Sequence, residues 1–259
     1  MSFIPIIENT FFANGRYWGG LNSSLYRSGS FWVMKTGIES ADLNMVWNEK
    51  PLTREDRGSI EDIKISFQQA CLPFWCWVFP CGRSEATSEI LQSAGFSFIE
   101  SIPCMLADLS RPEVEENDRS LQIVQVQNEE TLCVWEKVSF AGFDFPPETQ
   151  HQYHRFVGTF NLKTDSPQKF FLAYFNGQPV ATSLLFLHET AAGIYFISTL
   201  AEFRRKGIGL AVTRAAMTAA RLAGAQYATL QSSPDGLHVY RQAGFQEYCR
   251  VDVYGLSGS

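Results

Sequence analysis

The sequence predicts a mixed α/β fold in two lobes. A polar and charged segment at 109–120, LSRPEVEENDRS, separates an N-terminal part from a C-terminal part. The C-terminal part contains a three-stranded meander at 169–200 and a late β-α-β unit at 193–233. Strands and helices in this order are typical of a central mixed sheet flanked by helices. The predicted parts are a domain at 1–110, a linker at 111–120 and a domain at 121–259.

The C-terminal elements are assigned from hydrophobic periodicity and turn signals. Residues 121–126 alternate between apolar and polar and predict a strand. Asn176–Gly177 is a strong hairpin signal between two apolar runs, and Gly224 ends an alanine-rich helix. The predicted strands are 121–126, 169–175, 179–187, 193–200, 227–233 and 245–256. The predicted helices are 128–140, 147–160, 208–223 and 235–243.

Composition and charge argue against several classes of protein. The chain has 259 residues and a net charge of −6, and this acidic balance argues against nucleic-acid binding. Its start, MSFIPIIENT, has neither the basic segment nor the long apolar run of a secretion signal. No apolar run reaches the about 18 residues of a membrane span. We therefore expect a cytoplasmic protein without nucleic-acid or membrane partners, as a monomer or homodimer.

The six cysteines have neither the density of a disulfide scaffold nor the spacing of a metal site. Cys71, Cys76 and Cys81 are five residues apart, and no histidine stands near them. We expect free thiols in the reducing cytoplasm and no metal.

A basic loop with two glycines stands between a predicted strand and a predicted helix. Its sequence is RRKGIG, from Arg204 to Gly209. The first amides of a helix have no partners inside it, and the helix dipole adds partial positive charge, so this end is an anion site. Gly207 and Gly209 leave the backbone open to close approach, while Arg204, Arg205 and Lys206 add positive charge. The loop suits a pyrophosphate, although an exposed basic turn before a helix would have the same sequence pattern.

The loop and its surroundings resemble the GNAT superfamily of acetyl-CoA-dependent N-acetyltransferases. RRKGIG fits the family's R/Q-x-x-G-x-G/A acyl-CoA loop, and it follows a strand, GIYFISTL, and opens a helix, as that motif does. Downstream, SSPDGLHVYRQAGF at 232–245 resembles the second signature, in which a strand end leads to a helix with a tyrosine and then Gly-Phe. The resemblance covers about 120–255 and implies the acyl-CoA N-acyltransferase fold with acetyl-CoA as cosubstrate.

The resemblance implies roles for the matching residues. The end of the strand at 193–200 would pair with the pantetheine arm and donate an N–H to the thioester oxygen, and the loop amides would hold the pyrophosphate. Ser233 stands where many relatives carry an asparagine that contacts the cofactor. The residues implied to bind acetyl-CoA are Ser198, Thr199, Leu200, Arg204, Arg205, Lys206, Gly207, Ile208, Gly209 and Ser233.

Tyr240 matches the family tyrosine that lies near the CoA sulfur. A phenol with a reference pKa near 10 is protonated at neutral pH, so it would protonate a departing thiolate of pKa about 8.5. This residue is the predicted catalytic acid. The alternative is a helix tyrosine that only packs against the sheet.

The N-terminal part resembles a second, degenerate copy of the same domain. Gly95 in AGF at 94–96 aligns with Gly244 in AGF at 243–245, an offset of 149 residues (244 − 95), and the same offset places Gly207 on Gly58. In this ungapped register, positions 204, 205, 209 and 240 are occupied by Glu55, Asp56, Ile60 and Leu91. Carboxylates would repel a pyrophosphate, so we expect no CoA binding of this kind there.

This N-terminal part also resembles the first half of two-lobed GNAT proteins, and we expect it to shape the acceptor cleft. Its aromatic run, LPFWCWVFP at 72–80, contains Phe74, Trp75, Trp77 and Phe79. These side chains either line that cleft or belong to a buried central strand.

The general base is not evident from the sequence. Relatives use a carboxylate on a central strand or a water chain, and GIYFISTL has no carboxylate. Histidine titrates nearest neutral pH, which favours His154 among the alternatives. The other candidates are Glu202, Asp144, Glu148 and His151. The segment FAGFDFPPE at 140–148 forms either a partly apolar acceptor surface or simple packing.

These features predict an N-acetyltransferase that moves an acetyl or other short acyl group from acyl-CoA to the primary amine of an acceptor. Attack would be direct, through a tetrahedral intermediate held by a strand N–H. One alternative is a non-catalytic protein that binds and senses acyl-CoA, which the missing strand carboxylate favours and Tyr240 opposes. Another is a transferase that acts on a protein N-terminus or lysine.

Overall fold

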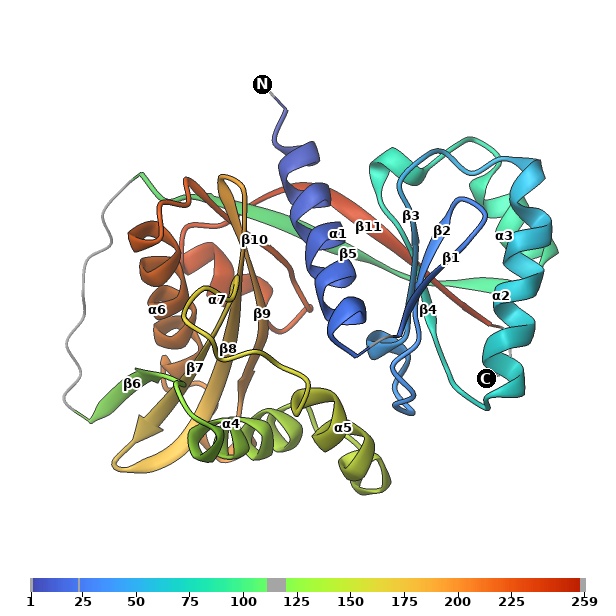
Figure 1. Cartoon of the computed structure of the whole chain (residues 1–259). Helices are drawn as coiled ribbons and strands as arrows, with labels where there is room; N and C mark the ends of the chain where they lie inside the picture. Colours follow the sequence, from blue (N-terminus) through green and yellow to red (C-terminus); the bar gives the residue numbers. More distant parts are fainter. Residues whose placement is uncertain (1, 23, 111–119, 257–259) are drawn as a thin grey trace. The chain divides into compact units, whose positions relative to one another are not determined.

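A computed structural model of the chain describes residues 2–22, 24–110 and 120–256, and these fall into two compact units (Figure 1). Unit 1 consists of 1–14, 104–150 and 160–248, and unit 2 consists of 15–103, 151–159 and 249–259. Each unit therefore includes segments from both halves of the chain. The domains proposed at 1–110 and 121–259 divide the chain at a single point, whereas each unit also contains segments from the other half of the chain. Most of the proposed linker at 111–120 lies outside the described residues.

The sheet of unit 1 has the strand order β5-β10-β9-β8-β7-β6. The neighbours from β6 to β9 are antiparallel, β9 and β10 are parallel, and β10 and β5 are antiparallel. The strands are β5 (Phe96–Asp108), β6 (Leu121–Gln125), β7 (Gln168–Phe175), β8 (Gln178–His188), β9 (Ala191–Thr199) and β10 (Tyr227–Gln231). The mixed sheet expected from the sequence is confirmed.

The helices of unit 1 also follow the expected series, with ends shifted by a few residues. They are α4 (Glu129–Gly142), η4 (Pro147–Thr149), η5 (Ala201–Phe203), α6 (Ile208–Leu222) and α7 (Leu237–Gln242). Asn176 and Gly177 both have positive φ, of 51° and 80°. Two such residues in succession make the two-residue turn whose twist suits a hairpin.

Helices α4 and α6 cover opposite faces of this sheet. Trp135 of α4 contacts Phe170, with ring centroids 5.4 Å apart, whereas Phe171 belongs to the apolar cluster that includes Val212 and Ala216 of α6. Successive residues of a strand point to opposite faces. The two faces of β7 to β9 are therefore both buried, which explains why these strands are mostly apolar.

Unit 2 has the strand order β1-β2-β3-β4-β11. Strand β3 is parallel to β4, and β4 is antiparallel to β11. Its elements are β1 (Leu25–Ser28), β2 (Phe31–Met34), η1 (Ala41–Leu43), β3 (Met45–Asn48), η2 (Arg54–Asp56), α2 (Arg57–Gln69), β4 (Trp75–Val78), η3 (Pro80–Gly82), α3 (Thr87–Ser93), most of α5 (Gln150–Val157) and most of β11 (Gln246–Leu256).

The aromatic run at 72–80 is largely buried, as the second sequence alternative supposed. Phe74, Trp77 and Phe79 are all buried, while Trp75 is half-buried. The Phe74 ring stacks on Phe67 of α2 with centroids 4.2 Å apart. Phe74 belongs to the core under α2, together with Ile60, Ile63 and Phe67.

The same β-α-β arrangement occurs once in each unit. In unit 2, α2 joins the parallel strands β3 and β4, and in unit 1, α6 joins the parallel strands β9 and β10. Each is followed by a short helix that ends at a glycine of positive φ, Gly95 at 89° and Gly244 at 94°. The strand that follows each short helix pairs with a strand of the other copy: β5, which follows α3, pairs with β10, and β11, which follows α7, pairs with β4. We call β5 and β11 the exchanged strands.

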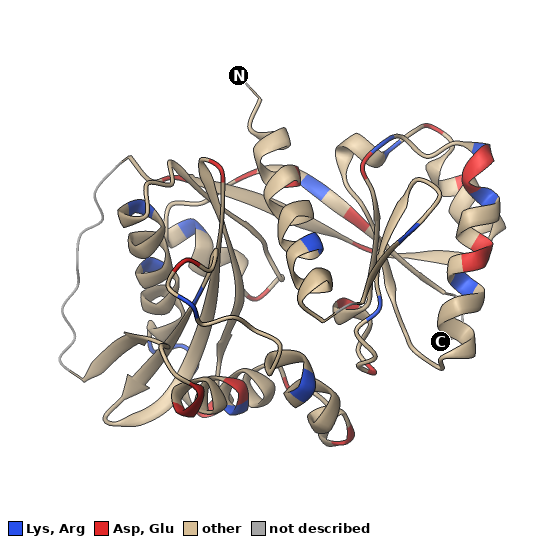
Figure 2. Cartoon of the chain, viewed as in Figure 1, with Lys and Arg blue, Asp and Glu red and all other residues tan. Residues whose placement is uncertain are grey.

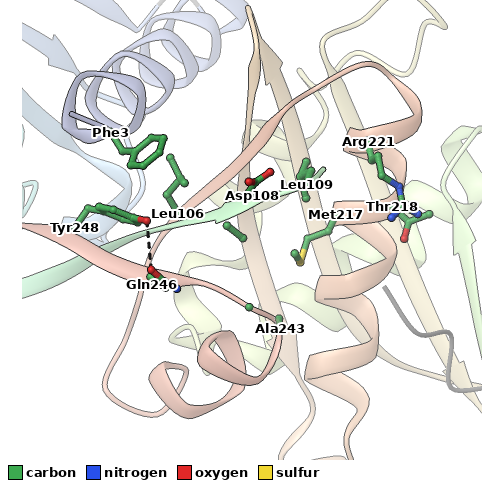
Figure 3. Close-up of a pocket in the computed structure, with 12 residues that line it drawn as sticks. Phe3, Leu106, Asp108, Leu109, Met217, Thr218, Arg221, Ala243, Gln246 and Tyr248 are labelled. Carbon is green, nitrogen blue, oxygen red and sulfur yellow. Dashed lines mark hydrogen bonds between the residues drawn. The ribbon is translucent and has the colours of Figure 1, made fainter. Parts of the chain in front are cut away.

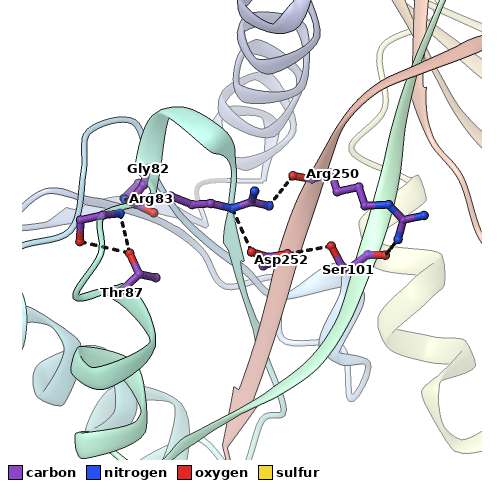
Figure 4. Close-up of polar contacts among 8 residues, drawn as sticks. Gly82, Arg83, Thr87, Ser101, Arg250 and Asp252 are labelled. Carbon is purple, nitrogen blue, oxygen red and sulfur yellow. Dashed lines mark hydrogen bonds and ion pairs between the residues drawn. The ribbon is translucent and has the colours of Figure 1, made fainter.

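A polar network holds the exchanged strand β11 within unit 2 (Figure 4). The Arg83 Nε atom lies 2.9 Å from Oδ2 of Asp252, and the Ser101 hydroxyl donates to Oδ1 of Asp252 at 2.7 Å. Arg250 donates to the Ser101 carbonyl at 3.0 Å. Charge-assisted hydrogen bonds of this kind fix the position of β11 more firmly than neutral bonds would.

The N-terminal helix α1 (Ile4–Leu21) was not anticipated from the sequence. It begins in unit 1 and ends in unit 2. None of the helices in the described part of the chain is long and apolar enough to cross a membrane.

Candidate functional site

The loop before α6 presents unsatisfied amides to solvent. Gly207 is the N-cap of α6, with a φ of 76°, and Arg205 also has a positive φ of 60°. Among the described residues, the amides from Arg205 to Leu210 donate to no backbone carbonyl. Residues 204–207 are exposed. The start of α6 therefore has the free donors and the dipole that bind anions.

The three basic side chains of this loop do different things. Arg204 is committed to the protein, because its guanidinium donates to the Thr199 carbonyl at 3.0 Å and to the Gly142 carbonyl at 3.1 Å. Lys206 lies over two aromatic rings, with Nζ 4.9 Å from the Phe203 centroid. Arg205 is exposed at the positive-φ turn. The sequence suggested one cluster of charge, whereas the structure uses Arg204 to tie the loop to α4.

Strands β9 and β10 pair only at their beginnings. The parallel register joins Tyr227–Thr229 to 191–193, and the pairing stops there. Across β9, the pairing with β8 shifts register between Thr182 and Leu184, and Phe196 has a φ of 49°. A bulge of this kind bends a strand and increases its twist. The second half of β9 thus has an edge that β10 does not occupy.

The end of β9 is braced from within the sheet. The buried Thr182 and Ser198 hydroxyls are 2.8 Å apart, and Thr182 also donates to the Phe196 carbonyl at 2.9 Å. The Leu200 amide donates to the Val180 carbonyl at 2.9 Å, so it is used by β8. Because alternate residues of an antiparallel strand point their amides to opposite neighbours, the Thr199 amide faces away from β8. Of Ser198, Thr199 and Leu200, Thr199 is the one placed to donate to a ligand.

Tyr240 lies in α7 with a buried ring. Its side chain is 8% exposed, and burial raises the pKa of the phenol above its ordinary value. The ring packs on Gly236, where an added Cβ would lie 2.5 Å from Tyr240 Cε2. Ser233 accepts a hydrogen bond from the Gly236 amide at 3.2 Å. Ser233 therefore supports the turn that positions Tyr240.

The candidate bases from the sequence are all exposed side chains. Glu202, Asp144 and Glu148 are exposed, and His151 and His154 are exposed residues of unit 2. Sequence reasoning missed Glu136, which is only 9% exposed in α4. Glu136 shares a helix face with Phe140 and Phe143 at spacings of four and seven residues. The spacing places Glu136 on this face of the helix, but its burial could not be predicted from the sequence.

The described residues contain no group of three or more histidine, cysteine or acidic side chains that could hold a metal ion. The six cysteines are free thiols.

The start of α2 differs from the start of α6. Gly58 is the second residue of α2, as Gly209 is the second residue of α6, so the helix starts are offset by 151 residues (209 − 58) rather than 149. The ungapped register fails there. Asp56 accepts from the Thr53 amide at 2.8 Å and from the Ser30 hydroxyl at 2.5 Å. Acidic and basic residues alternate along α2 (Figure 2), and Asp56 puts a carboxylate where Gly207 stands in α6.

A separate cavity of about 340 Å³ lies farther along α6 (Figure 3). Met217, Thr218 and Arg221 line it together with Phe3 and Tyr248. The Phe3 and Tyr248 rings are 5.0 Å apart. Since Met217 is ten residues beyond Gly207, the cavity is about 15 Å along the helix from the loop amides. It is distinct from the anion site.

The family comparison identifies the segment that carries this site. The profile of the "Acetyltransferase (GNAT) family" matches residues 128–245, which contain α4, the loop before α6 and Tyr240. No curated protein sequence matches the chain significantly.

Solved structures share the fold of the chain at low sequence identity. A GCN5-related N-acetyltransferase from Kribbella flavida is 17% identical with a TM-score of 0.74, over 100% of this chain and 97% of that protein. One from Sphaerobacter thermophilus is 14% identical with a TM-score of 0.64, over 87% of this chain and 76% of that one. A tandem GNAT protein from the clavulanic acid biosynthesis pathway is 13% identical with a TM-score of 0.56, over 88% and 83%.

Gly207 is needed for its positive φ, whereas Gly209 has no such conformational requirement. Alanine substitution should therefore affect stability differently at the two positions. Gly207→Ala places a Cβ at a φ of 76°, and we expect it to lower the free energy of unfolding by about 1 kcal/mol. Gly209→Ala meets only Thr199 Oγ1 at 3.6 Å and should be neutral or slightly stabilising. Urea denaturation measures both, and equal losses would contradict the assigned conformation of the loop.

Proposed function

We propose, from the premise that residues 128–245 form an acetyltransferase domain of the GNAT family, that the protein transfers an acetyl or other short acyl group from acyl-CoA to a primary amine. Members of this family are acyltransferases that use acetyl-CoA. The observation that carries the proposal is the set of free amides from Arg205 to Leu210 at the start of α6, beside the unpaired edge of β9.

The residues before α6 fit the pyrophosphate of acyl-CoA. Gly207 and Gly209 have no side chain over the free amides, and a Cβ at Gly207 would meet open space. Several N–H groups directed at one anion, together with the helix dipole, stabilise it by about 0.5–2 kcal/mol per interaction. Arg205 adds an exposed positive charge. Arg204 acts indirectly, because it fixes the loop to the carbonyls of Thr199 and Gly142.

The open edge of β9 fits the pantetheine arm. An extended chain with amide groups adds to a strand edge through backbone hydrogen bonds, and β9 beyond Gly193 offers such an edge. The Thr199 amide would donate to the thioester oxygen, where negative charge grows as the amine attacks. Acyl-CoA supplies an activated acyl carbon and a thiolate leaving group.

Two side chains would move the protons. Tyr240, kept protonated by burial, gives its proton to the departing sulfur and regains one from solvent. Glu136 takes the proton that the amine nitrogen loses, directly or through water. The balance is one new C–N bond, one broken C–S bond and one proton transferred from nitrogen to sulfur overall.

Unit 2 takes no part in binding acyl-CoA in this proposal. It belongs to the degenerate copy proposed for the N-terminal domain at 1–110, and Asp56 at the start of α2 opposes a phosphate by like charge. The acyl-CoA pool and the six free thiols are both consistent with the cytoplasm as the place of action.

Acetyl-CoA binding tests the proposal directly. At a concentration about 100 times its dissociation constant, acetyl-CoA should raise the free energy of unfolding by about 2.7 kcal/mol. Gly209→Ile should abolish this gain, because a branched side chain would cover the free amides.

The matched control for Gly209→Ile is Gly58→Ile, the equivalent helix position in unit 2, where an added Cβ meets nothing. This variant should keep the full gain. Calorimetric titration with acetyl-CoA gives the affinities. No binding to the unsubstituted protein, or loss of binding in Gly58→Ile alone, would refute the proposed site.

Tyr240→Phe tests the proton donor and separates an enzyme from a sensor. We expect kcat to fall about 100-fold while acetyl-CoA affinity stays unchanged. Because burial raises the pKa of Tyr240, the unsubstituted enzyme should show no alkaline loss of kcat from this group up to about pH 10. The control is Tyr248→Phe, which should leave kcat and its pH profile unaltered. An unchanged kcat in Tyr240→Phe would assign the proton to another group.

A further inference from the structure

The C-terminal end of α4 lies directly against the end of β9. An added Cβ at Gly142 would come within 2.5 Å of Ser198 Oγ, so the helix approaches the strand as closely as a glycine permits. Arg204 stabilises this contact, because its guanidinium donates hydrogen bonds to both the Gly142 carbonyl and the Thr199 carbonyl. The residues around Gly142 therefore lie beside Thr199, where the acyl group is proposed to bind.

The residues on either side of Gly142 present an aromatic surface, which we define as Phe140, Phe143 and Phe145. Phe143 is 40% exposed although it is a large apolar side chain. Its ring is 5.7 Å from Phe145 and 5.7 Å from Phe196 at the bulge of β9. The Phe140 and Phe145 centroids are 5.8 Å apart. The aromatic surface thus continues from α4 to the strand that would carry the thioester.

A carboxylate stands on the same face of α4. Glu136 precedes Phe140 by four residues and Phe143 by seven, so the three side chains lie along one side of the helix. Its exposure of 9% puts a negative charge in a region of low dielectric, where it interacts strongly with a cation. Asp144, next to Phe143, adds a second, exposed carboxylate. The face combines negative charge with aromatic rings.

We propose that this face selects the acceptor, and that the acceptor is a small primary amine bearing an aromatic or branched apolar group. The inference rests on the proposed transfer from acyl-CoA and adds the substrate class. The ammonium group of the free amine is drawn to Glu136, and its apolar part packs on Phe143 and Phe145. Strongly polar amines such as amino sugars and polyamines lack a group for the aromatic surface, and they would leave it exposed to water.

The test compares phenethylamine with ethanolamine, which share a primary aminoethyl unit and differ in the ring. Acetyl transfer is followed as free CoA thiol and as product mass. We expect kcat/KM for phenethylamine to exceed that for ethanolamine at least about tenfold, since burying a side chain of this size is worth one to two powers of ten. Phe143→Ala should remove most of that preference.

Two variants control the comparison. Phe98→Ala removes another exposed phenylalanine, 51% exposed and in unit 2, and should preserve the preference. Glu136→Gln should lower turnover of both amines, whereas Glu130→Gln, exposed on the same helix, should not.

Acetyl-CoA affinity is measured on every sample, so that failure of the inference can be told from failure of the proposed function. Equal turnover of the two amines, no turnover of either by a protein that binds acetyl-CoA, or an undiminished preference in Phe143→Ala would overturn the substrate class alone. Absence of acetyl-CoA binding would overturn the proposed function together with it.

Discussion

Unpaired backbone donors at the junction of β9 and α6 are the constraint on which the proposed function depends. A buried strand normally pairs along both edges, and the first amides of a helix normally receive a cap. Here β10 leaves β9 after three residue pairs, and Gly207 begins α6 without a side-chain cap. An extended ligand with an anionic end satisfies both sets of donors at once. The rest of unit 1 holds these groups in place: Thr182 and Ser198 brace the bulge, and Arg204 fixes the loop.

The comparison of α6 with α2 shows how the same local fold avoids an anion. Both helices connect parallel strands and have a glycine as the second residue. At α2, Asp56 precedes the helix and takes hydrogen bonds from Thr53 and Ser30. A carboxylate at a helix N-terminus has the favourable dipole interaction that a phosphate would otherwise have. The proposed degenerate copy has thus placed its own anion at this position.

Much of unit 1 could be predicted from the sequence because its signals are local. Asn176–Gly177 specifies a turn, apolar alternation specifies β6, and RRKGIG specifies a helix start with free amides. The exchange of β5 and β11 could not be predicted, because each strand lies far along the chain from the strand with which it pairs. Pairing between strands so far apart in sequence leaves no periodic trace.

The candidate site could be predicted only in part, because its contacts also join residues that are far apart in sequence. The sequence gives Arg204, Arg205 and Lys206 equal charge, and only the structure shows that Arg204 bonds to Thr199 and Gly142. The sequence also does not show that the Leu200 amide donates a hydrogen bond to the Val180 carbonyl. Glu136 was overlooked because a glutamate in a helix is ordinarily exposed, and its burial depends on packing rather than on its neighbours in sequence.

Hydrogen exchange of the backbone amides, with and without acetyl-CoA, tests the central claim most directly. The free donors of the α6 loop should exchange rapidly in the unliganded protein. Acetyl-CoA should slow exchange at Arg205 to Leu210 and at Thr199, and should leave Arg54 to Ser59 at the start of α2 unchanged. Protection at α2, or none at the α6 loop while acetyl-CoA is bound, would contradict the assignment of the acyl-CoA site.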